Sequence, residues 1–168
     1  MFLAVLLASL SLHIYPSEID SLLRELDMSI RNRPQYTLKR QEQIDALQRK
    51  LRLSHSDQER YDLYRELFGK YRSYRMDSAL WVANQRVELA KRMKNPLYIR
   101  SAELNIAEVM IGVAMYKEGL EILDGIKSAD LDASGVSYYY YQYHQVYTLM
   151  ADYAFSDQMK EHYRGLAY

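Results

Sequence analysis

The side chains that most often bind metals or carry catalysis are few in this chain, and their spacing does not bring them together. The four histidines match no metal-binding motif such as H-E-x-x-H; they are His13, His55, His144 and His162. The chain has no cysteine, which excludes disulfides and thiolate chemistry. These residues predict no metal centre and no bound cofactor.

Glycines and carboxylates in the C-terminal half also fail to form a catalytic pattern. The glycines stand alone in helix-forming sequence, where close helix packing explains them better than phosphate binding: Gly112, Gly119 and Gly125. Three carboxylates can share one helix face, but nothing converges on them as an acid–base partner: Glu118, Glu121 and Asp124. There is also no G-x-S-x-G nucleophile motif. We therefore expect that the protein is not an enzyme.

The composition excludes other function classes. Lys and Arg number 22, and Asp and Glu also number 22, so the net charge is zero and no basic field attracts nucleic acid. The most basic stretch, from Lys39 to Arg52, also contains Glu42 and Asp45, which is typical of a solvated helix face. Only 6 Gly and 3 Pro favour helices over a turn-rich β fold, and 17 Tyr supply side chains suited to core edges or to recognition.

The elements that would position any site are amphipathic helices. The clearest pair lies between Ser56 and Pro96. Its first helix places large side chains on one face: Tyr64, Leu67, Phe68 and Tyr71. Its second helix places small side chains on one narrow face, which permits close antiparallel packing: Ala79, Ala83, Val87 and Ala90. Ser56 and Glu59 have the spacing of a capping box at the start of this pair.

Similar helix starts recur along the chain. A first helix from Ser17 carries an apolar stripe and is expected to break at Pro34; the stripe is Ile19, Leu22, Leu23, Leu26 and Ile30. A second, from about Gln35 to Leu53, is expected to bury Tyr36, Ile44, Leu47 and Leu51. Predicted caps fall at intervals of 39 residues, at Ser17, Ser56, Asn95 and Ser134. The sequence therefore predicts an all-α fold, an α-solenoid of about four antiparallel helix pairs.

One of these units resembles a known family. The pair from Ser56 resembles the tetratricopeptide pattern W-x2-L-G-x2-Y…A-x3-F…P through Tyr64, Leu67, Phe68, Tyr71, Ala79, Ala83 and Pro96. It departs from that pattern in having Phe68 at a position usually held by a small residue, and in a period longer than the family's ~34 residues. With the apolar leader described next, the Tyr-rich repeats resemble the exported repeat region of envelope-tethered regulators of Bacteroidota. That resemblance implies a sensor region of a membrane-tethered transcriptional regulator.

The N-terminus has its own character. Residues 1–15 contain an apolar run, Phe2 to Leu12, which is too short to span a bilayer and is typical of a signal-peptide core. No Lys or Arg precedes Arg24, although a signal peptide usually begins with a positively charged segment. The alternative interpretation of the apolar run is a buried first helix. We expect export to the periplasm or cell envelope of a Gram-negative bacterium. We also expect residues 16–168 to form the repeat domain, to continue beyond Tyr168, and to meet a membrane only through the leader or a later C-terminal part.

The concave face of such a solenoid is the expected binding surface, because the first helix of each pair lines it. In the tetratricopeptide register that face carries Arg65, Gly69, Arg72, Leu104, Glu108, Ile111, Tyr140, Tyr143 and Tyr147. Six of these are the candidate partner-binding residues: Arg65, Arg72, Glu108, Tyr140, Tyr143 and Tyr147. A protein or peptide is the first expected partner, and a small ligand or glycan that stacks on the tyrosines is the alternative. The tyrosines have a structural alternative too, since Tyr139 and Tyr143 could pack between repeats.

Overall fold

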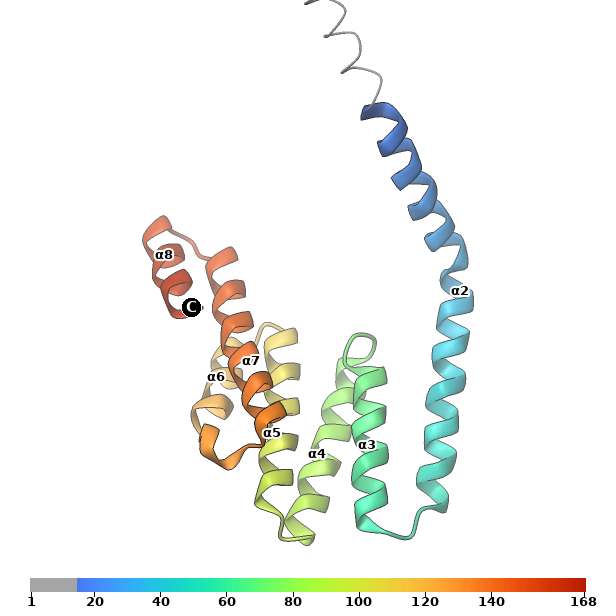
Figure 1. Ribbon diagram of the computed structural model, residues 1–168, viewed down its shortest axis with the longest axis vertical. Helices are drawn as coiled ribbons and strands as arrows, with labels where there is room; N and C mark the ends of the chain where they lie inside the picture. The colour runs from blue at the N-terminus through green and yellow to red at the C-terminus, as the bar shows by residue number, and fades with distance from the viewer. Residues whose placement is uncertain (1–14) are drawn as a thin grey trace, which may run out of the picture. The chain divides into compact units, whose positions relative to one another are not determined.

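The computed structural model describes residues 15–168, and every regular element in that range is helical (Figure 1). The elements are α2 (Tyr15–Leu53), α3 (Asp57–Tyr71), α4 (Met76–Arg92), α5 (Pro96–Gly112), α6 (Tyr116–Asp124), the 3-10 turn η1 (Ser128–Asp130), α7 (Ala133–Asp152) and α8 (Asp157–Leu166). The predicted leader, Phe2 to Leu12, lies outside the described residues. Within residues 15–168 no helix combines the length and apolarity of a membrane span. The all-α prediction is confirmed.

The chain divides into two compact units, residues 1–43 and 44–168. In the second unit, consecutive helices run antiparallel and pack as the pairs α3–α4, α5–α6 and α7–α8 (Figure 1). Leu67 of α3 is 1% exposed and shares a buried cluster with Ala79 and Ala83 of α4, which are fully buried. The small side chains of α4 thus form the close contact that their spacing predicts.

The predicted helix break at Pro34 is wrong, because α2 continues through this proline. Proline removes one helical N–H and would leave the carbonyl of Ile30 without its partner. Ile30 is 59% exposed and Tyr36 is 60% exposed, so water can hydrate that carbonyl and the helix survives. The predicted burial of Tyr36 is therefore also wrong.

The apolar side chains of α2 differ in burial along the helix. In the first unit, the stripe of Ile19, Leu22, Leu23, Leu26 and Ile30 is more than half exposed at every position. In the second unit, Ile44 and Leu47 are buried in one cluster with Leu67, as predicted, and Leu51 is partly buried. The first of the four predicted helix pairs is thus a single helix whose C-terminal end packs against α3.

Side-chain caps start the first helix of each pair in the second unit. Ser56 accepts a hydrogen bond from the Glu59 N–H at 3.1 Å, and Asn95 accepts one from the Tyr98 N–H at 3.2 Å. For α7 the cap is Asp132, 37 residues after Asn95 (132 − 95), and not the predicted Ser134. Ser17 lies inside α2, so the constant 39-residue interval holds only between Ser56 and Asn95.

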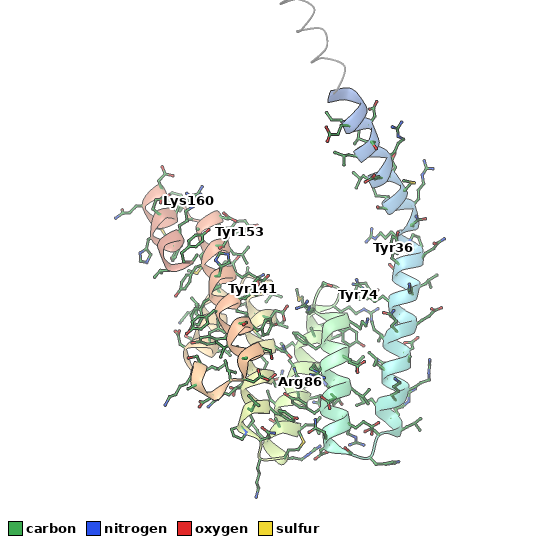
Figure 2. The ribbon with its side chains drawn as sticks, in the orientation of Figure 1. Tyr36, Tyr74, Arg86, Tyr141, Tyr153 and Lys160 are labelled. Carbon is green, nitrogen blue, oxygen red and sulfur yellow. The ribbon has the colours of Figure 1, made fainter. Side chains whose placement is uncertain are left out.

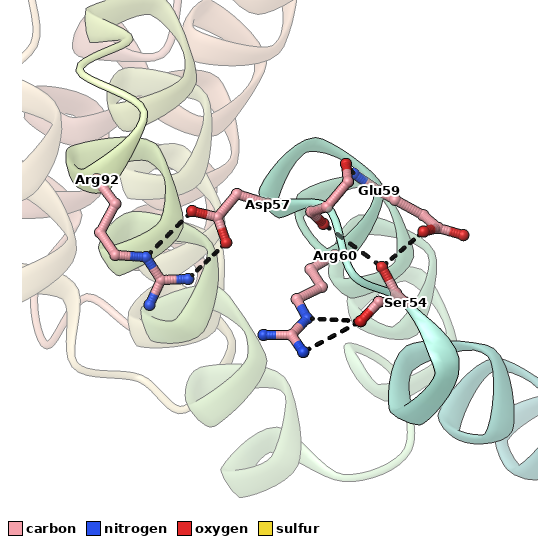
Figure 3. A network of polar contacts seen from close by, with 6 residues as sticks. Ser54, Asp57, Glu59, Arg60 and Arg92 are labelled. Carbon is pink, nitrogen blue, oxygen red and sulfur yellow. Dashed lines mark hydrogen bonds and ion pairs between the residues drawn. The ribbon is translucent and has the colours of Figure 1, made fainter.

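The start of α3 also carries a polar network (Figure 3). The Ser54 hydroxyl donates to the Glu59 carboxylate at 2.7 Å, and Arg60 donates to the Ser54 carbonyl oxygen at 3.1 and 3.3 Å. Arg92, at the end of α4, donates to both carboxylate oxygens of Asp57 at 2.8 and 3.2 Å. These bonds join the end of α2, the first turn of α3 and the last turn of α4.

Two of the connections between helices are short, and the same residue closes one helix and caps the next. Lys94 (φ 53°) and Ala114 (φ 63°) take the left-handed conformation that ends α4 and α5. The next residues, Asn95 and Met115, donate their N–H groups to carbonyls five positions earlier, at 3.1 and 2.8 Å, which is the Schellman pattern. Asn95 and Met115 are also the N-cap residues of α5 and α6. The connection from α6 to α7 is longer and contains η1.

Candidate functional site: a cavity lined by α3, α5 and α7

A cavity of about 470 Å³ opens beside the first helices of the three pairs. Its lining includes Asp62 of α3, Ser101 of α5 and Tyr138 of α7, each six residues after the N-cap of its helix. Arg86 of α4 lines it from the interior. Matching positions on three consecutive repeats therefore face one cavity of a size that ligand sites commonly have.

Glu108 joins three helices beside this cavity. Its carboxylate accepts a hydrogen bond from Arg72, the C-cap residue of α3, at 2.9 Å and another from the hydroxyl of Tyr138 of α7. The Glu108 carboxylate raises the pKa of Arg72. Burial, together with Glu108, raises the pKa of the Tyr138 hydroxyl well above its usual value. At neutral pH the site therefore holds a charged guanidinium and a neutral phenol that share one carboxylate.

Arg86 is a buried cation next to the same cavity, and its side chain is only 1% exposed. Its guanidinium donates to the Asn105 side-chain oxygen and lies 4.4 Å from the centre of the Tyr61 ring. Tyr61 in turn stacks on Tyr98, with ring centres 4.5 Å apart and planes 8° apart, and donates to the Tyr98 carbonyl oxygen at 2.8 Å. Figure 2 shows Arg86 among the side chains between the helices. Burial lowers the pKa of Arg86.

Several predicted groove residues lie together at this site. Arg65, Gly69, Arg72 and Leu104 line the cavity, and Glu108 bonds to Arg72 and Tyr138 beside it. Leu104 is 1% exposed and belongs mainly to the core. Ile111 is 2% exposed and lies in the same buried cluster.

The predicted tyrosines of α7 lie elsewhere. Tyr143 donates to the Asp124 carboxylate of α6 at 2.6 Å, and its ring lies 6.2 Å from that of Tyr147. Tyr140 is 58% exposed and packs edge-on against Tyr139. None of the three lines the cavity.

The position of the N-cap of α7 explains why these three tyrosines do not line the cavity. The cap at Asp132 lies two residues before Ser134, and two residues correspond to a rotation of about 200° around a helix axis. The position equivalent to Ser101 is therefore Tyr138 and not Tyr140. Sequence reasoning missed Tyr138, although Asp is as good an N-cap as Ser and signals this register.

Arg86 was missed for another reason. It lies between Ala83 and Ala90 on the small-residue face of α4, three residues after the first and four before the second, so its helical position indicates burial. A charged residue is seldom buried without a counter-charge, and only its position on this face could have revealed it. In the part of the chain that the structure describes, no group of three or more His, Cys, Asp or Glu could hold a metal ion.

Residues 30–168 match the family described as the SusR N-terminal TPR domain. The chain belongs to this family. The match begins inside α2 and extends to the end of α8, so the SusR-type TPR region includes every element that lines the cavity. The predicted tetratricopeptide-like repeat is thereby confirmed. Neither the curated proteins nor the solved structures contain a match.

Proposed function

We propose that this chain is a non-catalytic helical-repeat module that binds an extended segment of a protein or peptide in the cavity lined by α3, α5 and α7. The observation that carries the proposal is the shared lining position of Asp62, Ser101 and Tyr138 on three consecutive repeats. A segment that crosses these helices would meet one such position on each of them. Repeat solenoids offer extended concave surfaces of this kind.

The chemistry of the lining supports a peptide. Arg65 keeps 64% of its side chain exposed and Arg72 keeps 50%, so a partner can contact both side chains while they remain paired with Asp62 and Glu108. Tyr138 adds an aromatic ring at the same cavity. Arg and Tyr are enriched among residues that dominate binding energy, because each combines a large contact area with hydrogen bonding.

The proposal includes a cellular setting. The apolar run from Phe2 to Leu12 supports a leader in residues 1–15 and export to the periplasm or envelope of a Gram-negative bacterium. Membership of the SusR N-terminal TPR family supports a sensor region, residues 16–168, of a membrane-tethered transcriptional regulator. In such a protein, occupation of the cavity would be the signal.

Gly69 offers a direct test, because it lines the cavity and a Cβ added there would meet no atom within 4 Å. Random dodecapeptides displayed on phage would be selected on the immobilised chain, and the affinity of recovered peptides measured by fluorescence polarisation. Gly69→Leu places a side chain in the cavity and should weaken binding at least about tenfold, the effect of losing one strong contact. Leucine is also the better helix former, so the variant should melt no lower than the wild type.

Gly165→Leu is the matched control, because Gly165 lies in α8, away from the cavity, and also has open space around its Cβ position. It should leave peptide affinity unchanged. Equal affinity of the recovered peptides for the Gly69→Leu variant and the wild type would contradict the proposal.

A second function is favoured by a separate observation. Tyr140 and Tyr141 are 58% and 56% exposed, and exposed aromatic rings can stack on the faces of sugars. A glycan sensor would use these rings. Neutral oligosaccharides would then raise the melting temperature by mass action, and Tyr140→Ala plus Tyr141→Ala would abolish that rise while Gly69→Leu would not.

A further inference from the structure

The cavity contains three guanidinium groups, and two of them already have carboxylate partners. Arg65 pairs with Asp62 at 3.4 Å, and Arg72 pairs with Glu108 at 2.9 Å. Arg86 donates to the neutral side chain of Asn105. Among the ion pairs of the described residues none involves Arg86.

The remaining carboxylate at the cavity, Asp132, is occupied by the start of α7. Its Oδ1 accepts hydrogen bonds from the Gly135 N–H at 2.7 Å and from the Ser134 hydroxyl at 2.9 Å. These bonds, the one from Gly135 first, lower the pKa of Asp132. Asp132 is thus engaged by the first turn of α7, and it forms no ion pair with Arg86.

Arg86 is therefore a buried charge with an incomplete set of partners. Its Nε is buried and has no hydrogen-bond partner, and its guanidinium contacts the Asn105 amide and the face of the Tyr61 ring. The charges of Arg65 and Asp62 also act on it, with opposite signs and without an ion pair. An amide and an aromatic ring offset only part of the cost of removing a charge from water. An anion brought to the cavity would supply the missing charge.

We propose that the segment bound in the cavity presents a carboxylate, from an Asp or Glu side chain or from its C-terminus, that pairs with Arg86. The inference rests on the proposed function, since it names the chemistry that the cavity selects in a peptide. A single negative charge fits best, because one guanidinium lacks an ion-pair partner and the carboxylates of Asp62, Glu108 and Asp132 repel a dianion such as phosphate about twice as strongly as a monoanion. The guanidinium fork also suits a planar carboxylate.

A substitution at Asn105 can supply the missing carboxylate partner of Arg86 from the protein itself. Asn105→Asp is nearly isosteric and places a carboxylate against the Arg86 guanidinium, where the amide oxygen now accepts its bond. The internal carboxylate should compete with that of the peptide. Asn84→Asp is the matched control, because it adds the same charge at an exposed position of α4 that does not line the cavity.

The test uses the full chain with 15N-labelled arginine and follows the Nε–H resonance of Arg86 by NMR. The probe is the blocked tripeptide Ac-Ala-Glu-Ala-amide, with Ac-Ala-Gln-Ala-amide as its neutral counterpart, at matched ionic strength. The acidic peptide should shift the Arg86 resonance, and the neutral peptide should not. Asn105→Asp should weaken the acidic peptide about tenfold or more, the effect of losing one close charge pair, and Asn84→Asp should leave its affinity unchanged.

Several results would overturn the inference. They are an equal shift of the Arg86 resonance with both tripeptides, no shift with the acidic tripeptide, and a shift with chloride as large as that with the acidic tripeptide. A shift from trigalacturonate but not from the acidic tripeptide would overturn the peptide source, since the carboxylate would then belong to a sugar. If phage-selected peptides lose affinity in Gly69→Leu but bind equally well after their carboxylates become amides, the proposed function stands and the inference fails. Should Asn105→Asp fail to fold, the wild-type titration alone decides.

Discussion

The Glu108 bridge is the part of the site whose energetics can be worked out most fully. Its carboxylate holds Arg72 on one side and Tyr138 on the other, so it can be examined by two double-mutant cycles with a common member, Glu108→Ala. Arg72→Met keeps most of the aliphatic stem, and Tyr138→Phe keeps the ring. Packing lost with Glu108 is common to both cycles and cancels from the comparison.

The two coupling energies should differ. The Arg72 side chain is 50% exposed, and water screens its charge, so its coupling to Glu108 should be about 0.5 kcal/mol. The Tyr138 hydroxyl is partly buried and donates to a carboxylate that is itself only 21% exposed, so its coupling should be about 1.5 kcal/mol. The phenol, and not the ion pair, should therefore dominate the bridge.

Urea unfolding followed by circular dichroism gives the free energies for both cycles. Added salt provides a second readout, because it should reduce the Arg72 coupling and leave the Tyr138 coupling nearly unchanged. An Arg72 coupling as large as that of Tyr138, or two couplings within the additivity error of about 0.3 kcal/mol, would refute the reasoning.

Three further predictions concern the core, α7 and its cap. Leu67→Ala should lower the free energy of unfolding by about 2–5 kcal/mol, because its side chain is buried. Leu53→Ala should lower it by less than about 0.5 kcal/mol, because that side chain is 75% exposed. Similar urea midpoints for the two variants would exclude the observed packing. Tyr143→Ala should lower the free energy of unfolding by about 1–3 kcal/mol, because its ring is only partly buried. The same substitution should leave peptide affinity unchanged. A loss of affinity at unchanged stability would instead place Tyr143 in the binding surface. The lowered pKa of Asp132 stabilises the fold fully above the ordinary pKa of about 3.9, and this contribution is lost as pH falls through the folded value. Melting temperatures of the wild type and Asp132→Asn should therefore converge on acidification, and a constant difference would contradict this.

The repeat architecture was predictable because its signals are local. Ser56 and Asn95 satisfy N–H groups within their own first turns, and the small side chains at Ala79 and Ala83 pack against the preceding helix. Each feature depends on residues close in sequence or on the adjacent helix. The Pro34 break failed because the cost of proline depends on whether water reaches the freed carbonyl, and exposure is a tertiary property.

The site was less predictable because it depends on register. Asp132 and Ser134 are both good N-caps, and nothing local decides between them, yet the choice rotates the lining face of α7 from Tyr140 to Tyr138. For Arg86 the helix register is clear from the sequence, and the partners are what the sequence does not reveal. Its position on the buried face of α4 is visible in the sequence, but its partners come from α3 and α5.

The Schellman turns at Lys94 and Ala114 restrict where the chain can change in length. Asn95 ends one helix motif and begins the next, so one inserted residue would rotate α5 by about 100° and carry Glu108 away from Arg72. The connection from α7 to α8 carries no such double role at Phe155, whose side chain is 99% exposed and lies outside the cavity lining. Epitope tags, reporter domains and protease sites should therefore be tolerated between Ala154 and Phe155, and should destroy the cavity when placed at Lys94.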